Sequence, residues 1–263
     1  MGDEIIGLDI DGGIARMSLA RPDRGNAMDM AFFTRFAAVV GEIVRRRSEV
    51  RSVLITSSGP YFSVGGDIDS FVEGGEHLPE LILEGTSAIH GALARLARMD
   101  APVVVAVQGV AAGGAGALVA GCDLVIAARS ASISAAYSRI GFSCDMGSSR
   151  AYASRMGVSR ARRFLLLGET LDAEGAERAG LVDEVVDVDR LTEVAEGYAR
   201  RFAAGPTRAY GEIRRLVDRA LGTPLETQLE DEALALARTA GTLDGREGVT
   251  AFAEKRSPVF VGR

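Results

Sequence analysis

Two glycine-rich turns are the parts of this 263-residue sequence best suited to chemistry. The first, residues 61–68 (YFSVGGDI), contains Gly66, and the second, residues 108–116 (QGVAAGGAG), contains Gly114. Glycines leave backbone N–H groups uncovered, and at the start of a helix these groups also carry a partial positive charge. Two such N–H groups aimed at one oxygen stabilise an oxyanion without titrating themselves. The two turns could therefore donate backbone N–H bonds to one developing oxyanion.

Both turns also have structural interpretations, and the turns alone leave these open. Gly-Gly-Asp is a common turn in which Asp67 caps a short helix. The small residues of the second turn are also typical of close helix packing. A dinucleotide or nucleotide-triphosphate site is excluded, because no G-x-G-x-x-G opens the first strand-helix unit and no P-loop lysine follows a glycine run.

Three titratable residues are candidates for proton chemistry. Asp145 lies in residues 141–147 (GFSCDMG), where apolar neighbours would partly desolvate its carboxylate. The alternative is that Asp145 caps a helix over residues 147–156. His90 lies on a predicted helix, where packing is the more common role of a single histidine. Tyr137 is a poor base at neutral pH, since the pKa of a free tyrosine is about 10.

The order of elements predicts an α/β fold. Strands and helices alternate, since β-branched runs at 14–19, 52–56, 103–107 and 124–128 are separated by apolar-periodic or Gly/Ala-rich helices at 30–46, 78–97 and 114–120. After Gly141 the sequence is mainly helical, with one strand-like run at 184–186. Amphipathic helices are predicted at 225–240 and 247–255. We expect a core over residues 1–200 and a helical region over residues 201–263, which could pack on its own subunit or on a neighbouring copy.

Composition limits the possible partners. The formal net charge is -6, which argues against a nucleic-acid surface. The longest apolar stretch, residues 101–120, contains one glutamine and four glycines, so we expect no membrane span. Cys122 and Cys144 form no C-x-x-C pair and residues 1–14 lack a signal-peptide pattern, so we expect a cytoplasmic protein with no structural metal. Arginine clusters at 45–47 and 160–163 suit phosphates, although solvated helix faces are the simpler interpretation.

Several motifs in order resemble the enoyl-CoA hydratase/isomerase family, the crotonase superfamily, over nearly the whole chain. They are Arg21-Pro22 with Asn26-Ala27-Met28, residues 62–68, residues 109–116, Gly121-Cys122-Asp123-Leu124, residues 168–173, residues 179–182 and residues 248–256. The resemblance implies a ββα spiral core, a helical C-terminal region, and homotrimers or dimers of trimers. It also assigns the oxyanion hole to the N–H groups of Gly66 and Gly114.

The resemblance further implies an acyl-CoA substrate. Coenzyme A would enter as part of the thioester, with no permanently bound cofactor. The positions matching the family's CoA site are Asn26, Ala27, Met28, Val64, Asp67 and Ile68, with Phe252 and Lys255 supplied by the tail of a neighbouring copy.

The catalytic positions depart from those of the family's hydratases, which carry two glutamates. Ala117 and Tyr137 stand at these positions here, whereas Asp145 matches the aspartate of many isomerase-type relatives. We therefore expect a lyase-like family enzyme that acts as a double-bond or aryl-epoxide isomerase with Asp145 as the proton shuttle. The alternatives are a 2-enoyl-CoA hydratase of fatty-acid oxidation, an aryl-CoA dehalogenase or thioester hydrolase that uses Asp145 with His90, and a non-catalytic CoA-ester binder.

Overall fold

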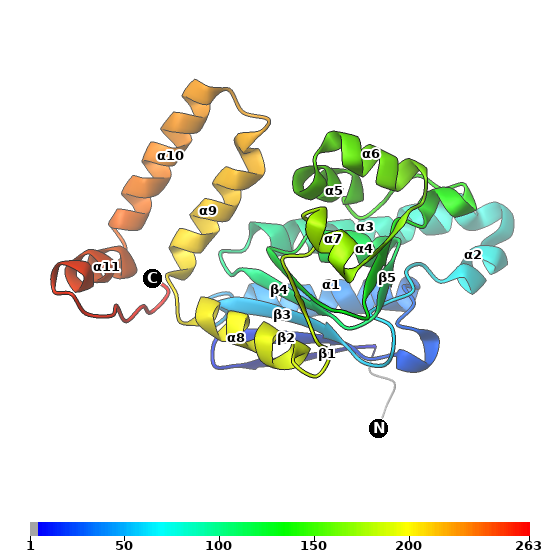
Figure 1. Ribbon diagram of the computed structural model, residues 1–263, viewed down its shortest axis with the longest axis horizontal. Coiled ribbons are helices and arrows are strands. Elements are labelled where there is room, and N and C mark those ends of the chain that lie inside the picture. Colours follow the sequence, from blue (N-terminus) through cyan, green and yellow to red (C-terminus); the bar gives the residue numbers. More distant parts are fainter. Residues whose placement is uncertain (1–4) are drawn as a thin grey trace.

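A six-stranded sheet forms the centre of the protein, as the computed structural model of residues 5–263 shows (Figure 1). Residues 1–4 of the N-terminal segment considered above lie outside the described part. The strand order is β1-β2-β3-β4-β6-β9, and every neighbouring pair is parallel except β1 with β2. The strands are β1 Ile6–Asp11, β2 Ile14–Leu19, β3 Ser52–Ser57, β4 Val103–Val107, β6 Leu124–Ala128 and β9 Glu184–Val186. The predicted α/β class is confirmed.

A second, three-stranded sheet continues from the first. Its order is β5-β7-β8, with β5 Val110–Ala112, β7 Ser132–Ser134 and β8 Thr170–Asp172. The chain passes from β4 to β5 at Gly109, where a Cβ atom would lie 2.0 Å from the carbonyl oxygen of Pro60. Only glycine fits this corner. The unit of two strands and a helix occurs as β4-β5-α4 and again as β6-β7-α5, which is the ββα spiral of the crotonase fold.

Helices cover both faces of the large sheet. The helices α1 Met30–Arg45 and α3 Leu78–Arg98 pack against one another, and the buried side chains of α1 recur at the helical period, as in Phe32, Phe36 and Val40. On the other face, α8 Leu191–Ala203 places Ala195 and Ala199 in a separate apolar cluster. The remaining helices of the core are α2 Ile68–Gly74, α4 Gly114–Ala120, α5 Ser148–Met156, α6 Val158–Leu166, α7 Ala173–Arg178 and the 3-10 turns Pro22–Arg24, Gly75–His77 and Tyr137–Ile140.

Three C-terminal helices extend away from the sheet (Figure 1). They are α9 Thr207–Ala220, α10 Leu225–Ala240 and α11 Leu243–Ala253. Within residues 5–263, the two apolar core clusters contain no residue beyond Ala203. The helices also expose large apolar side chains, including Val217, Leu221 and Phe252. The predicted trimer-forming role of this region stays a prediction.

Several sequence-based predictions of elements were incomplete or wrong. β1 was missed, although Ile6, Leu8 and Ile10 alternate before a Gly12-Gly13 hairpin turn in which both glycines have positive φ. β5, β7 and β8 were missed because three residues are too few for an alternation pattern. α11 begins at Leu243 and not at residue 247 as predicted. Thr242 caps this helix, because its side chain accepts a hydrogen bond from the Gly245 N–H.

None of the helices between residues 5 and 263 has the length and apolar character needed to cross a membrane. In the same residues, no group of three or more His, Cys, Asp or Glu side chains is placed to hold a metal ion.

Candidate active site

The two glycine-rich turns lie side by side. Ser63 donates its N–H to the carbonyl of Val110 and accepts from the N–H of Ala112, both at 3.0 Å, so the segments pair in parallel with Ser63 opposite Ala111. Gly66 and Gly114 each lie three residues beyond this pair. Gly65 has φ +87°, and a Cβ atom on it would lie 2.5 Å from the carbonyl oxygen of Ala112. Glycine at position 65 therefore permits the close approach of the two turns.

The backbone amides of Gly66 and Gly114 are available to a ligand. Neither N–H group has a hydrogen-bond acceptor among residues 5–263. Both glycines line the same cavity, which has a volume of about 1280 Å³. Two uncommitted donors in one cavity are what the predicted oxyanion hole requires.

Asp145 and His90 meet at this cavity. The Nε2 atom of His90, on α3, lies 2.6 Å from Oδ1 of Asp145, within hydrogen-bond distance. The side chains are 49% and 35% exposed, respectively. The alternative interpretation of Asp145 as a helix cap is wrong, because α5 begins after Gly147 and has no side-chain cap. The packing interpretation of His90 is also wrong.

Tyr137 supports the loop that carries Asp145. Its hydroxyl donates to the backbone carbonyl oxygen of Asp145 at 3.2 Å. Burial raises the pKa of Tyr137 well above its usual value, so the phenol stays neutral at ordinary pH. Tyr137 therefore has the geometry of a hydrogen-bond donor and not of a base.

Two strained residues flank these side chains. Ala136 has φ +46°, and the Tyr137 N–H donates across it to the carbonyl of Ala135, which forms a tight three-residue turn. Met146, next to Asp145, has φ +53°. Non-glycine residues with positive φ cost about 1–3 kcal/mol each, and such costs concentrate at functional sites.

Apolar side chains complete the cavity, and among those named here only Met28 was predicted as a site residue. The rings of Phe71 and Phe142 lie with their centroids 5.6 Å apart. Met28, Met146 and Ile140 line the same cavity. An apolar cavity with few polar groups is typical of a site for a largely hydrophobic ligand. Phe71 gave no sequence signal, since its position depends on how α2 packs.

The predicted CoA-binding residues divide into two sets. Met28, Val64 and Ile68 line the cavity. Asn26 and Ala27 are buried beside it. The side-chain amide of Asn26 donates to the carbonyls of Ser58, Tyr61 and Phe62, so it links its own loop to the loop that follows β3. Its contact with CoA stays a prediction.

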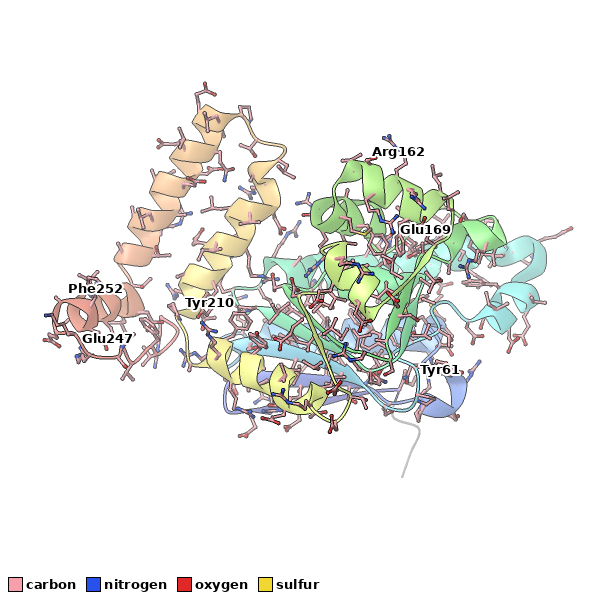
Figure 2. All side chains as sticks on the ribbon, viewed as in Figure 1. Tyr61, Arg162, Glu169, Tyr210, Glu247 and Phe252 are labelled. Atoms are coloured by element: carbon pink, nitrogen blue, oxygen red, sulfur yellow. The ribbon has the colours of Figure 1, made fainter. Side chains whose placement is uncertain are left out.

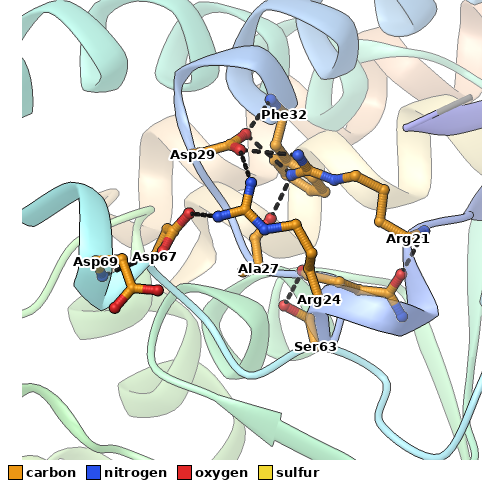
Figure 3. Close-up of polar contacts among 9 residues, drawn as sticks. Arg21, Arg24, Ala27, Asp29, Phe32, Ser63, Asp67 and Asp69 are labelled. Carbon is orange, nitrogen blue, oxygen red and sulfur yellow. Dashed lines mark hydrogen bonds and ion pairs between the residues drawn. The ribbon is translucent and has the colours of Figure 1, made fainter. Parts of the chain in front are cut away.

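Two arginines join the starts of two helices at the cavity (Figure 3). Arg21 makes a bidentate ion pair with Asp29, at 2.8 and 2.9 Å, and Asp29 caps α1. Arg24 donates to Asp67 at 2.6 Å, and Asp67 caps α2. The predicted capping role of Asp67 is confirmed. Because Asp67 follows Gly66, this pair helps to fix the Gly66 amide.

The sequence matches the enoyl-CoA hydratase/isomerase family over residues 9–263. The chain belongs to this family. It is 35% identical to the 1,2-epoxyphenylacetyl-CoA isomerase of Escherichia coli over 97% of each chain, and 29% identical to the trans-2-decenoyl-[acyl-carrier-protein] isomerase of Streptococcus mutans over 97% of each. The crystal structure of an enoyl-CoA hydratase from Polaromonas sp. JS666 superposes with a TM-score of 0.90, at 28% identity, over 96% of this chain and 98% of that one.

Within this hydratase/isomerase fold, the C-terminal candidates lie far from the cavity of their own chain. Figure 2 shows Phe252 on α11 at one end of the molecule. Tyr61, the first residue of the 61–68 turn, lies near the opposite end. Phe252 is 87% exposed. Neither Phe252 nor Lys255 lines this cavity. A contribution from them requires a neighbouring copy.

Ala117 and Tyr137 are the positions at which the sequence predicts that the two hydratase glutamates are replaced. The methyl group of Ala117 is buried on α4 and cannot titrate. Tyr137 is described above.

Proposed function

We propose that this enzyme is an acyl-CoA isomerase in which Asp145 carries a proton between two carbons of a CoA thioester. The single observation that carries the proposal is the position of the Asp145 carboxylate, bonded to His90, in the same cavity as the uncommitted Gly66 and Gly114 amides. A 1,3-proton shift needs one base and one oxyanion hole, and this cavity offers one of each.

The proposed reaction begins with the thioester oxygen accepting hydrogen bonds from the Gly66 and Gly114 N–H groups. The free carboxylate oxygen of Asp145 removes a proton from the α carbon of a 3-enoyl thioester. The electron pair of the broken C–H bond delocalises into a dienolate whose charge rests on the held oxygen. Asp145 then returns the proton to the γ carbon, and the double bond moves to the 2 position. His90 holds the other carboxylate oxygen throughout.

Some of the relatives are isomerases by name, one of an epoxyphenylacetyl-CoA and one of a decenoyl-acyl-carrier protein, whereas others are probable enoyl-CoA hydratases by name. The proposal of an isomerase therefore rests on the residues of the site. Hydration requires a second acid or base, and here the two candidate positions hold Ala117 and a half-buried Tyr137 that stays neutral. Opening of an aryl epoxide thioester remains within the proposal, since aromatic rings line the cavity.

We also propose that the active enzyme is a homotrimer or a dimer of trimers. The exposed apolar side chains of α9 to α11 support burial against another copy. Phe252 and Lys255 of one copy would then reach the CoA bound to the next, where the Lys255 ammonium would pair with a phosphate. Coenzyme A would be present only as part of the substrate.

A second candidate is hydrolysis through a covalent intermediate, and the 2.6 Å contact between His90 and Asp145 favours it. Asp145 would attack the halogen-bearing ring carbon of an aryl-CoA, halide would leave, and His90 would accept a proton from the water that hydrolyses the resulting ester. Tyr137 stands where the dehalogenases of the family carry tryptophan, which counts against this reaction.

The test compares three substrates with the wild-type enzyme and Asp145→Asn. Formation of conjugated thioester absorbance from 3-hexenoyl-CoA, abolished by Asp145→Asn with little change in acyl-CoA affinity, supports the isomerase. Halide release from 4-chlorobenzoyl-CoA supports the hydrolytic candidate instead. Loss of absorbance from crotonyl-CoA supports a hydratase, and binding without any turnover supports a non-catalytic binder.

A further inference from the structure

A second cavity, of about 810 Å³, lies between the core and the C-terminal helices. It shares no lining residue with the active-site cavity. The ends of α1 and α3, the start of α9 and the C-terminal tail form its walls. Six arginines line it, namely Arg47, Arg51, Arg95, Arg98, Arg208 and Arg263. We call it the arginine cleft.

The positive charge of the arginine cleft is not balanced by nearby carboxylate side chains. Asp100 is the one acidic side chain in its lining, and it is already paired with Arg215 at 2.7 Å. Arg51 donates to backbone carbonyls. The other five arginines have no ion-pair partner in the described part of the chain, and all five are exposed. Such a concentration of cations is notable in a chain of net charge -6.

Helix ends explain only part of this charge. Arg95 and Arg98 lie in the last turn of α3, where cations are favourable beside the helix carbonyls. Arg208 is in the first turn of α9, where that effect is unfavourable for a cation, and Arg263 is on the tail. Cations from the core and from the C-terminal region therefore face the same space for a reason other than the helix dipoles.

The arginine cleft also lies at a polar joint. Arg51 holds the C-terminal region by donating to the carbonyls of Gly205, at 2.7 Å, and Phe260, at 3.1 Å. Arg214 and Arg215 of α9 pair with Asp123 and Asp100 of the core, at 2.8 and 2.7 Å. No apolar cluster of residues 5–263 crosses this joint. One aromatic pair does cross it, since Phe202 of α8 and Tyr210 of α9 pack edge to face with ring centroids 5.5 Å apart. The placement of α9 to α11 thus depends on this pair and on the polar contacts beside the cleft.

We propose that the arginine cleft binds a ligand with two or more adjacent phosphate groups, and that this ligand fastens the C-terminal helices to the core. Guanidinium groups match phosphate oxygens with paired hydrogen bonds. Adjacent phosphates can contact Arg95 and Arg98 on the core side and Arg208 on the C-terminal side at once. The volume is sufficient for a nucleotide-sized molecule.

The first test measures binding of inorganic pyrophosphate by calorimetry. We expect saturable binding to the wild type, weakened on the order of tenfold or more in Arg95→Ser/Arg98→Ser, since each change removes charge-assisted hydrogen bonds. The matched control is Arg162→Ser/Arg201→Ser, which removes the same charge at two exposed positions outside the cleft. Binding within twofold of wild type is expected there. Equal weakening in both variants, or no saturable binding to wild type, would overturn the proposal.

The second test asks whether the ligand fastens the helices. Pyrophosphate should slow backbone hydrogen exchange in α9 near Thr207 and in the tail, but not in β4. Binding without that protection would overturn the fastening part. ADP and CoA are then titrated against bound pyrophosphate: displacement by ADP alone identifies a free nucleotide, displacement by both identifies a second CoA, and displacement by neither restricts the ligand to inorganic polyphosphate.

Discussion

His90 Nε2 and Asp145 Oδ1 lie 2.6 Å apart, within hydrogen-bond distance, although 55 residues separate them in the chain. α3 supplies the histidine, and the loop before α5 supplies the aspartate. The contact occupies one carboxylate oxygen and leaves the other for a substrate. The identity of the reaction therefore depends on whether that free oxygen takes a proton or attacks a carbon.

Asp145→Asn distinguishes loss of chemistry from loss of binding. The amide keeps the size of the carboxyl and cannot act as a base, so we expect kcat for 3-enoyl-CoA isomerisation to fall about 10²- to 10⁴-fold. KM should change little. Asp69→Asn is the control, because Asp69 is an exposed acid on α2. Turnover that survives Asp145→Asn would remove the isomerase proposal.

His90→Gln separates the two candidate reactions. Glutamine can still donate a hydrogen bond to Asp145, but it cannot accept a proton from water. If the enzyme is an isomerase that uses His90 only to hold the carboxylate, kcat should fall about tenfold or less, which corresponds to one weakened charged hydrogen bond. A hydrolase that needs His90 as a base should lose a further order of magnitude or more. Steady-state rates with both substrates measure the difference.

Gly113→Ala tests the oxyanion hole through the backbone. Gly113 has φ +52° and ψ -119°, and a Cβ atom there meets nothing within 4 Å, so strain is the only direct effect. The strain should tilt the next amide, that of Gly114, and lower kcat on the order of 10²-fold. Gly75 has nearly the same conformation, φ +50° and ψ -124°, also in open space. Gly75→Ala should cost similar stability, about 1–3 kcal/mol, while keeping most of kcat.

The ion pair between Arg24 and Asp67 should matter for turnover more than for binding. Arg24→Met removes the ion pair with Asp67, the residue that follows Gly66. We expect kcat to fall about tenfold, because small displacements of a donor weaken transition-state hydrogen bonds. Arg24→Lys keeps the charge and should recover part of the loss. If KM alone rises, Arg24 contacts CoA instead of positioning Gly66.

The sequence predicted the parts of the fold that follow from local patterns. Strands at 103–107 and 124–128 were placed correctly because they are continuous buried runs, and the helix at 225–240 because its apolar positions recur over four turns. Each strand of the small sheet is too short to carry a pattern. Its position is fixed by tertiary contacts, such as the Gly109 corner.

The candidate site was predictable from local residue types only where glycines mark it. The pairing of His90 with Asp145 was suggested only by the family resemblance, since nothing local fixes how α3 packs beside the loop. The aromatic pair Phe71 and Phe142 was missed for the same reason. Residues that meet only in space give no periodic signal.

Asp29 makes the stability of the site depend on pH. Burial opposes its ionisation, but hydrogen bonds from Arg21 and from the Phe32 N–H outweigh burial, so the pKa of Asp29 is lowered. A carboxyl whose pKa is lower in the folded state stabilises the fold above its unfolded pKa, about 3.9, and this contribution is lost as the pH falls through the folded pKa.

Asp29→Asn should therefore destabilise the protein mainly at neutral pH. We expect a loss of about 1–3 kcal/mol at pH 7, because the neutral amide keeps part of the helix cap but not the bidentate pair with Arg21. The free energies of unfolding of variant and wild type should begin to converge as the pH falls below about 4, where the carboxyl of the unfolded chain becomes protonated, and the convergence should continue down to the lower pKa of the folded state. Urea unfolding at several pH values between 7 and 3 measures both curves. A difference that stays constant over this range would mean that Asp29 acts through packing alone, and that its ion pair with Arg21 contributes nothing to the stability of the loop beside Gly66.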